Sequence, residues 1–285
     1  VNVLPSAAGR YRVLVSNTAG SVTSAEATLI VLPGQLGPAV VINEVLAKNH
    51  SVTNGDGTVS DWVELCNLTA QPLDLTDCSL TDDPANPRRW VFPASTIVLA
   101  SGFLVVRCDG GSPPSTNAVA TLNTGFRLYA GGGQVFLFNR LANGGAMLDS
   151  LVFGLQAADY SLGRVPDGTG PWTLGLPTLA TSNATAILGD PAALKINEWM
   201  ANMRTGGDWF ELYNPQAQPV AIGDCYLTDD LAVPTKFQIP ARSYVGHGAD
   251  AYAVFYSGTE AVAEGMPIPF RLSNSGESIG LFTSS

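Results

Sequence analysis

The sequence predicts an all-β protein made of antiparallel β-sandwich modules in tandem. Short runs rich in Val, Thr and aromatic residues alternate with turn residues, and the chain holds 30 Gly and 19 Pro among its 285 residues. No amphipathic helix of three turns is evident in the pattern. One long internal repeat is present, and the length suffices for two ordinary domains plus a smaller unit.

Several β-rich runs are each bounded by Gly, Pro, Asn or Asp, which is the pattern of strands separated by turns. The predicted strands of the first repeat cover residues 39–46, 62–68, 96–107, 134–139 and 147–153. Residues 249–256 are the nearest approach to a helical pattern, and we interpret them as a strand as well. Several short strands within about 140 residues favour a sandwich.

The repeat is seen as blocks that recur in one order at offsets of 144 to 154 residues, with 147 the commonest. The matched blocks are Ile42-Asn43-Glu44 with Ile196-Asn197-Glu198, Asp61-Trp62-Val63-Glu64-Leu65 with Asp208-Trp209-Phe210-Glu211-Leu212, Asp77 to Asp83 with Asp224 to Asp230, and Phe126-Arg127-Leu128 with Phe270-Arg271-Leu272. A period of this size indicates a duplicated domain rather than a solenoid.

These blocks predict four segments. Residues 1–33 form a separate hairpin unit, residues 40–178 the first repeat, residues 179–193 a linker rich in Ala, Ser, Thr and Asn, and residues 194–285 the second repeat. Nothing in the second repeat matches residues 149–172 of the first. We therefore expect the second repeat to end early, to expose a sheet edge and to be less stable.

Charge and hydropathy disfavour some classes of partner. The net charge is −10 with 14 Lys and Arg residues, and their nearest approach to a cluster is Arg88-Arg89. Electrostatics therefore disfavours nucleic-acid binding, as well as binding to an anionic membrane surface. No apolar run is long enough to span a membrane. The chain opens at Val1 in strand-like sequence, without a signal peptide, so we expect an internal piece of a longer protein.

Residues 9–31 alternate, turn at Asn17 to Gly20, and alternate again. This segment resembles the last two strands of an immunoglobulin-like domain, with Tyr11 at the place of the tyrosine corner. Val13 stands where that family usually has a cysteine.

The two repeats resemble the bacterial lamin tail domain. The resemblance rests on the order Ile-Asn-Glu, Asp-Trp-x-Glu-Leu-x-Asn, Leu-Thr-Asp-Asp, Phe-Pro-Ala, Phe-x-Leu before a Gly-rich turn, and Ser-x-Gly-Arg. It implies tandem immunoglobulin-like sandwiches that are not catalytic, in a large secreted or cell-surface bacterial protein. The function implied is a spacer or adhesion segment, with a protein or cell-surface polymer as partner. The alternative is an accessory region of an extracellular enzyme, such as a hydrolase, nuclease or spore-coat-kinase-like protein, whose catalytic domain lies outside these residues.

Glu44 and Glu64, with Glu198 and Glu211 in the second repeat, are the residues that could be paired catalytic carboxylates. A glycosidase needs two such groups facing each other across a cleft. The competing interpretation, which we favour, is that they hydrogen-bond neighbouring backbone and specify the fold. We predict no catalytic residue and no enzymatic activity for this chain.

The loop from Asn54 to Asp61 resembles a calcium site. Asn54, Asp56 and Asp61 offer the oxygen ligands that calcium prefers in a flexible turn, although no Glu closes the loop. A plain turn built on Asn-Gly and Asp-Gly is the alternative and is favoured. Calcium is the one cofactor that the sequence suggests.

The cysteines suggest one disulfide. Cys66 and Cys108 occur in the first repeat and are absent together from the second, which favours their pairing among the three possible connectivities. Cys78 and Cys225 are equivalent to each other, so we expect them to be buried thiols. A disulfide would fit an extracellular location.

Overall fold

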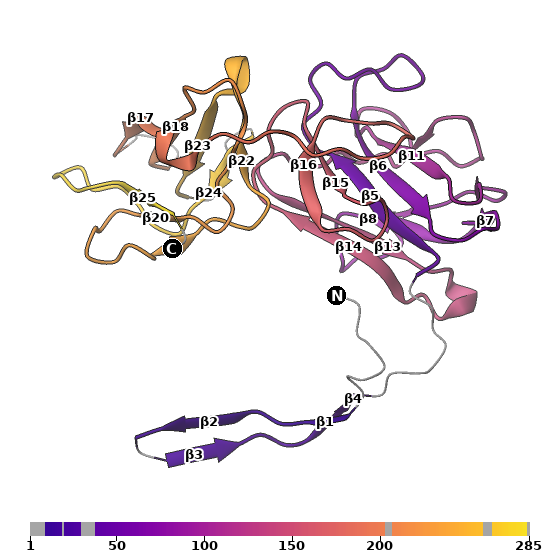
Figure 1. Ribbon diagram of the computed structural model, residues 1–285, viewed down its shortest axis with the longest axis horizontal. Coiled ribbons are helices and arrows are strands. Elements are labelled where there is room, and N and C mark those ends of the chain that lie inside the picture. Colours follow the sequence, from indigo (N-terminus) through magenta and orange to yellow (C-terminus); the bar gives the residue numbers. More distant parts are fainter. Residues whose placement is uncertain (1–8, 19, 30–37, 203–206, 259–263, 284–285) are drawn as a thin grey trace. The chain divides into compact units, whose positions relative to one another are not determined.

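The computed structural model describes residues 9–18, 20–29, 38–202, 207–258 and 264–283 of the chain. Two compact units are present, Val1–Ala39 and Val40–Ser285. Both are all-β, as the sequence predicts (Figure 1). Helical structure in the described residues is confined to three 3₁₀ turns, η2 (Leu141–Asn143), η3 (Pro191–Ala193) and η4 (Gly248–Asp250). None of the described helical segments has the length and apolar character needed to cross a bilayer.

The first unit is a long hairpin. Strand β2 (Leu14–Asn17) pairs with β3 (Gly20–Thr23), and the ladder resumes where β1 (Gly9–Tyr11) pairs with β4 (Ala27–Leu29). The predicted hairpin is thus confirmed over its described residues. Residues 1–8 and 30–33 of the predicted segment lie outside the described residues, and derivation from an immunoglobulin-like domain stays a prediction.

Residues Val40–Thr178, called module one below, form a sandwich with a six-stranded and a four-stranded sheet. The six-stranded sheet has the order β12 (Leu122–Asn123), β11 (Phe103–Cys108), β6 (Asp61–Asn67), β5 (Val40–Leu46), β15 (Ser161–Arg164) and β16 (Trp172–Gly175). The four-stranded sheet has the order β14 (Met147–Phe153), β13 (Gly133–Phe138), β8 (Ser79–Thr81) and β9 (Trp90–Val91), and a short ladder pairs β7 (Leu73–Asp74) with β10 (Ile97–Val98).

Apolar side chains from both sheets form one core in module one. Ile42, Leu65 and Val106 come from the larger sheet, and Leu80 and Leu137 from the smaller. All five are fully buried. Alternation along each strand places these residues between the sheets, because successive side chains of a strand point to opposite faces.

Residues Leu194–Ser285, called module two below, repeat this plan with nine strands in the described residues. They are β17 (Lys195–Met200), β18 (Trp209–Tyr213), β19 (Val220–Ala221), β20 (Tyr226–Thr228), β21 (Phe237–Gln238), β22 (Tyr244–Val245), β23 (Tyr252–Tyr256), β24 (Met266–Pro267) and β25 (Gly280–Phe282). Their sheet orders, β17-β18-β23-β24, β21-β20-β25 and β19-β22, match those of β5 to β13. Strands β14 to β16 have no counterpart in the described part of module two.

The repeat extends to the backbone conformation. Asp77 and Asp224 have φ of 66° and 68°, and Ser95 and Arg242, also 147 residues apart, have φ of 64° and 61°. Left-handed residues other than Gly are uncommon. Matching strained positions at the same offset therefore indicate that the two modules share one turn geometry.

The Asp82-Asp83 pair of the first repeat and the Asp229-Asp230 pair of the second lie in the same kind of turn. The Thr81 hydroxyl donates to the carbonyl of Asp83 and accepts from its N–H, and Thr228 makes the same two bonds with Asp230. The carboxylates of Asp83 and Asp230 each accept a backbone N–H two residues later. These aspartates therefore shape turns.

Two strand predictions need correction in detail. The run 96–107 is two strands, β10 and β11, because a turn closed by the N–H of Gly102 on the carbonyl of Leu99, at 3.0 Å, separates them. Residues 249–256 begin with η4 and continue as β23, so the strand prediction holds for their second part.

The predicted linker 179–193 contains no named strand, yet its first part is fastened to module one. The N–H of Ala180 donates to Glu64, and the side chain of Asn183 donates to the carbonyls of Asn43 and Arg164, both at 3.1 Å. An isolated bridge joins Thr185 to Gly175. This segment is thus an extension of module one and not a free tether.

Candidate functional site

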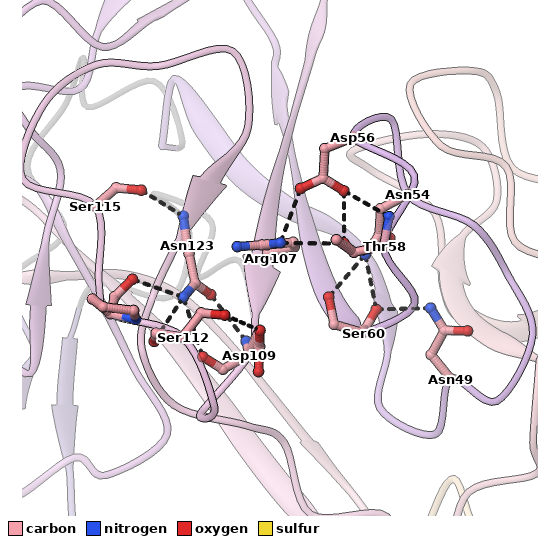
Figure 2. A network of polar contacts seen from close by, with 11 residues as sticks. Asn49, Asn54, Asp56, Thr58, Ser60, Arg107, Asp109, Ser112, Ser115 and Asn123 are labelled. Carbon is pink, nitrogen blue, oxygen red and sulfur yellow. Dashed lines mark hydrogen bonds and ion pairs between the residues drawn. The ribbon is translucent and has the colours of Figure 1, made fainter.

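The Asn54–Asp61 loop joins β5 to β6 and is closed by its own polar groups. The carboxylate of Asp56 accepts the N–H of Thr58 at 3.1 Å and its hydroxyl at 2.6 Å, while Arg107 of β11 donates to the other oxygen at 2.9 Å (Figure 2). The hydrogen bond from Thr58 holds the pKa of Asp56 below its ordinary value. Asp56 is therefore paired with a cation of the protein itself.

The other two predicted calcium ligands have separate partners. The buried Asn54 donates its amide to the Ser60 hydroxyl at 2.8 Å (Figure 2). Asp61 accepts the N–H of Asn49 at 3.1 Å and a backbone hydrogen bond from Leu128. Burial raises the pKa of Asp61 to about 6. The three side chains thus stabilise three different stretches of backbone.

Within the described residues, no group of three or more His, Cys, Asp and Glu side chains has the arrangement of a metal site. The Oδ1 atom of Asn54 is buried without a hydrogen-bond partner, and it is the one oxygen of the three predicted ligands with that property. The turn interpretation describes the observed contacts. Calcium binding at Asn54, Asp56 and Asp61 stays a prediction.

A neighbouring network around Asn123 of β12 was not foreseen from the sequence. Its side chain accepts the N–H of Asp109 and donates to the carbonyls of Asp109, Ser112 and Pro113 at 3.0–3.1 Å, and its own N–H donates to the Ser115 hydroxyl (Figure 2). One amide thereby fixes the loop after β11. The surrounding Thr-Leu-Asn-Thr string carries no motif that would have marked it.

Glu44 and Glu64 lie opposite each other on β5 and β6 and are 1% and 0% exposed. Glu44 accepts the Ser161 hydroxyl at 2.6 Å, and the N–H and hydroxyl of Thr178 at 3.1 and 2.8 Å. Glu64 accepts the N–H of Ala180 at 2.6 Å. The two carboxylates therefore bind the strand β15 and the segment that follows module one.

Asp167 and Asn43 complete this buried cluster. Asn43 donates to Glu64 at 2.9 Å and to Asp167 at 3.3 Å, and Asp167 also accepts the N–H of Asn183 at 3.0 Å. Burial raises the pKa of Glu64 to about 7, and the nearby Glu44 and Asp167 carboxylates act in the same direction. Burial likewise raises the pKa of Glu44.

These carboxylates do not present the arrangement of a catalytic pair. Such a pair must face a cleft that admits substrate, whereas Glu44 and Glu64 are covered by protein and accept donors from their own chain. The contacts match the structural interpretation favoured from the sequence. In module two the equivalent Glu198 is exposed and Glu211 is half-buried, although the bond from Asn197 to Glu211 persists at 2.8 Å.

The predicted disulfide between Cys66 and Cys108 is wrong. All four cysteines are buried thiols, and Cys66 and Cys108 lie at opposite ends of the paired strands β6 and β11. Cys66 stands opposite Phe103, and Cys108 opposite Asp61. Five residues of extended strand separate the two positions by about 17 Å, far beyond disulfide reach. The burial expected of Cys78 and Cys225 is confirmed.

The contact between the two modules is a second feature that the sequence did not reveal. The loop after β14 exchanges backbone hydrogen bonds with module two, from Gly154 to the carbonyl of Ala241 at 3.2 Å and from Tyr244 to the carbonyl of Leu155 at 2.7 Å. Leu155 packs in the core of module two and Tyr244 in that of module one. The two cores therefore interlock.

Charged groups reinforce this joint. Lys48 is 8% exposed and forms ion pairs with Asp250 and, at 3.0 Å, with Glu264. Asp250 also accepts the N–H of Ala158 at 2.6 Å, and His247 shares a hydrogen bond of 3.0 Å with Tyr160. Lys48 is one of three lysines in the chain. Its rarity is the one sequence signal that could have drawn attention to it.

Residues 34–154 match the family model described as Lamin Tail Domain. This match supports a lamin tail domain in module one. It covers the two sheets of that module up to β14, and it agrees with the immunoglobulin-like sandwich observed there. No curated protein and no solved structure matches the chain. The match ends in module one, and the likeness of module two to module one is the shared order of strands described above.

Proposed function

We propose that this chain is a non-catalytic structural and interaction segment of a large secreted or cell-surface bacterial protein, in which two lamin-tail-like modules act as one rigid spacer. The observation that carries the proposal is the interlocked joint, in which each module contributes an apolar side chain to the core of the other. A flexible pair of binding modules would not need this exchange. The lamin tail match in module one supports a structural role.

Close backbone packing at the joint supports rigidity. A Cβ atom on Gly154 would lie 1.9 Å from the Ser243 hydroxyl oxygen, and one on Gly131 would lie 2.2 Å from the carbonyl oxygen of Gly265. Contacts this close tolerate no side chain, so both glycines keep the modules in direct contact. Gly55 offers a contrast, since a Cβ atom there would meet nothing within 4 Å and its backbone is not left-handed.

The experiment measures the distance between the modules in the full chain. Spin labels at Leu99→Cys and Leu231→Cys, both exposed positions, report it by double electron–electron resonance, and the native cysteines are buried. We expect one narrow distribution. The Gly154→Ala variant should broaden it, and Gly55→Ala should leave it unchanged. A broad distribution in the unmodified chain would contradict a rigid spacer.

An accessory role beside an extracellular enzyme is compatible with the same rigid geometry, because a spacer can serve either kind of protein. In either kind of protein, partners bind to the surfaces of the modules, and the Glu44–Glu64 cluster catalyses no reaction. Turnover of a substrate by the full chain that Glu64→Gln abolished without unfolding would overturn it.

A further inference from the structure

We propose that Lys48 of module one and Asp250 of module two condense to an amide bond between the lysine Nζ and the aspartate Cγ, which locks the joint covalently. Glu264 is the group that moves protons in this step. The inference goes beyond the proposed function, since a spacer can be rigid without such a bond. The reaction occurs once within the chain and involves no turnover of an external substrate.

The reacting groups come from three distant segments and meet in one place. The Nζ atom of Lys48 is ion-paired with Oδ1 of Asp250 and lies 3.0 Å from Oε2 of Glu264. The side chains of Lys48 and Asp250 are 8% and 17% exposed. An amine and a carboxyl group held in contact react far faster than the same groups free in water, because folding has already met the entropy cost of bringing them together.

The carboxylate of Asp250 is also held at its second oxygen. Oδ2 accepts the N–H of Ala158 at 2.6 Å, while Oδ1 faces the lysine. Attack on a carboxyl carbon drives negative charge onto the oxygen that stays, and a fixed backbone N–H stabilises that charge. A Cβ atom on Gly246 would lie 2.1 Å from Oδ2, so a side chain there would displace the carboxylate. The backbone thus determines which oxygen stays and which leaves.

The step balances without any other reactant. Lys48 passes one proton to Oδ1 of Asp250, which gives a neutral amine and a carboxylic acid. The electron pair of Nζ then forms the Nζ–Cγ bond, and the π pair of the carbonyl moves to Oδ2. Glu264 takes a second proton from Nζ and returns it to Oδ1. The Cγ–Oδ1 bond breaks, water leaves and Oδ2 recovers its double bond. A cavity of about 400 Å³ that Lys48 and Glu264 line receives the water.

Burial favours the amide over the ion pair. A buried ion pair retains part of the desolvation cost of its two charges, and a neutral amide carries no charge. The surface pair of Lys236 with Asp229 offers a contrast within the same chain. The side chain of Lys236 is 38% exposed, and no second carboxylate pairs with it among the described residues. We therefore expect Lys236 to remain a free amine.

Mass spectrometry of the purified full chain tests the proposal. The intact mass should lie below the mass of the sequence by one water. Trypsin should yield a branched product that joins residues 13–88 to residues 243–271, because it does not cleave after an acylated Lys48. Lys48→Arg should restore the full mass. The matched control is Lys195→Arg at an exposed lysine, which should leave the loss of water unchanged.

Two further variants separate the chemistry from folding. Asp250→Asn should form the same amide with loss of ammonia in place of water, so its product should have the mass of the unmodified product. Glu264→Gln should leave most chains at their full mass, since general acid–base catalysis contributes about a hundredfold or more to such rates. Unchanged hydrogen exchange of β18 and β23 would show that the Glu264→Gln chain stays folded.

Three outcomes would overturn the proposal. The folded chain could keep the mass of its sequence, the loss of water could persist in Lys48→Arg, or the loss could map to a linear peptide, as ring closure at Asp56-Gly57 would produce, instead of the branched product. The spin-label distances stay narrow in each case if the spacer is rigid, because backbone hydrogen bonds and apolar contacts also hold the joint. Failure of the amide is therefore distinguishable from failure of the rigid-spacer proposal.

Discussion

Strands β5 and β17 contain the same Ile-Asn-Glu sequence and have opposite environments. All residues of β5 are buried, whereas β17 is exposed at five of six positions with Ile196 half-buried. The difference arises from strands β14 to β16 and the segment after them, which cover β5, whereas no strand among the described residues covers β17 in this way. Burial of the motif is therefore imposed by later parts of the chain, and the motif does not determine it.

Part of the motif is nevertheless independent of this cover. The bond from Asn43 to Glu64 measures 2.9 Å in the buried module, and the bond from Asn197 to Glu211 measures 2.8 Å in the exposed one. The hydrogen bond between Asn and Glu thus depends on the pairing of these two strands and not on the strands that cover β5. The contacts of Glu44 with Ser161 and Thr178 belong to the cover. Substitutions at the two glutamates should separate these contributions.

We expect the largest difference in unfolding free energy between the two modules when Glu44→Ala is compared with Glu198→Ala. The first change removes the acceptor of the buried Ser161 hydroxyl and of the half-buried N–H and hydroxyl of Thr178, so module one should lose about 4 kcal/mol of unfolding free energy. The second removes an exposed side chain and should change module two by less than about 0.5 kcal/mol. Native-state hydrogen exchange of β6 and β18 in the full chain measures both. Equal losses would contradict the role of the cover.

The buried cluster also predicts a pH dependence for module one. The pKa of Glu64 is about 7 in the folded state, raised by burial from 4.5, so the folded state holds a proton that the unfolded state releases. Its stabilising contribution is complete below pH 4.5 and is lost as the pH rises through about 7, by at most about 3 kcal/mol. Urea unfolding between pH 4.5 and 8.5 measures the slope. Glu64→Gln should reduce the slope and leave the part that the raised pKa values of Asp61 and Glu44 cause, and an unchanged slope in that variant would contradict the role of Glu64.

The features that recur in the two repeats could be predicted from the sequence. The contacts between residues far apart in the chain could not. The duplicated blocks indicated the fold class and the repeated order of strands, because alternation and turn residues are local signals. The Cys66–Cys108 pairing failed because shared absence from module two says nothing about the strand register that separates them. The cluster of Asp167 with Glu44 and Glu64 joins residues more than 100 positions apart, and no local pattern marks it.

The contact between the two modules could not be predicted from the sequence either. Gly154, Leu155 and Lys48 belong to no motif in the sequence, and their importance follows from the residues of module two that they meet. Glycine spacing could not have identified Gly154 among 30 glycines, because many of the others also lie close to neighbouring atoms. The approach of Gly154 to Ser243 of module two is seen only in the folded chain.

The smallest stability changes are expected at one pair of equivalent positions, Val45 of β5 and Trp199 of β17. Val45 is 1% exposed, so Val45→Ala should cost module one about 2 kcal/mol through lost burial and the cavity left behind. Trp199 stands at the equivalent place and is 60% exposed, so Trp199→Ala should change the stability of module two by less than about 0.5 kcal/mol despite the larger deletion. Hydrogen exchange of β6 and β18 again reports the two values. A loss above about 2 kcal/mol for Trp199→Ala would mean that β17 is already covered in solution, which would contradict the difference between the two modules.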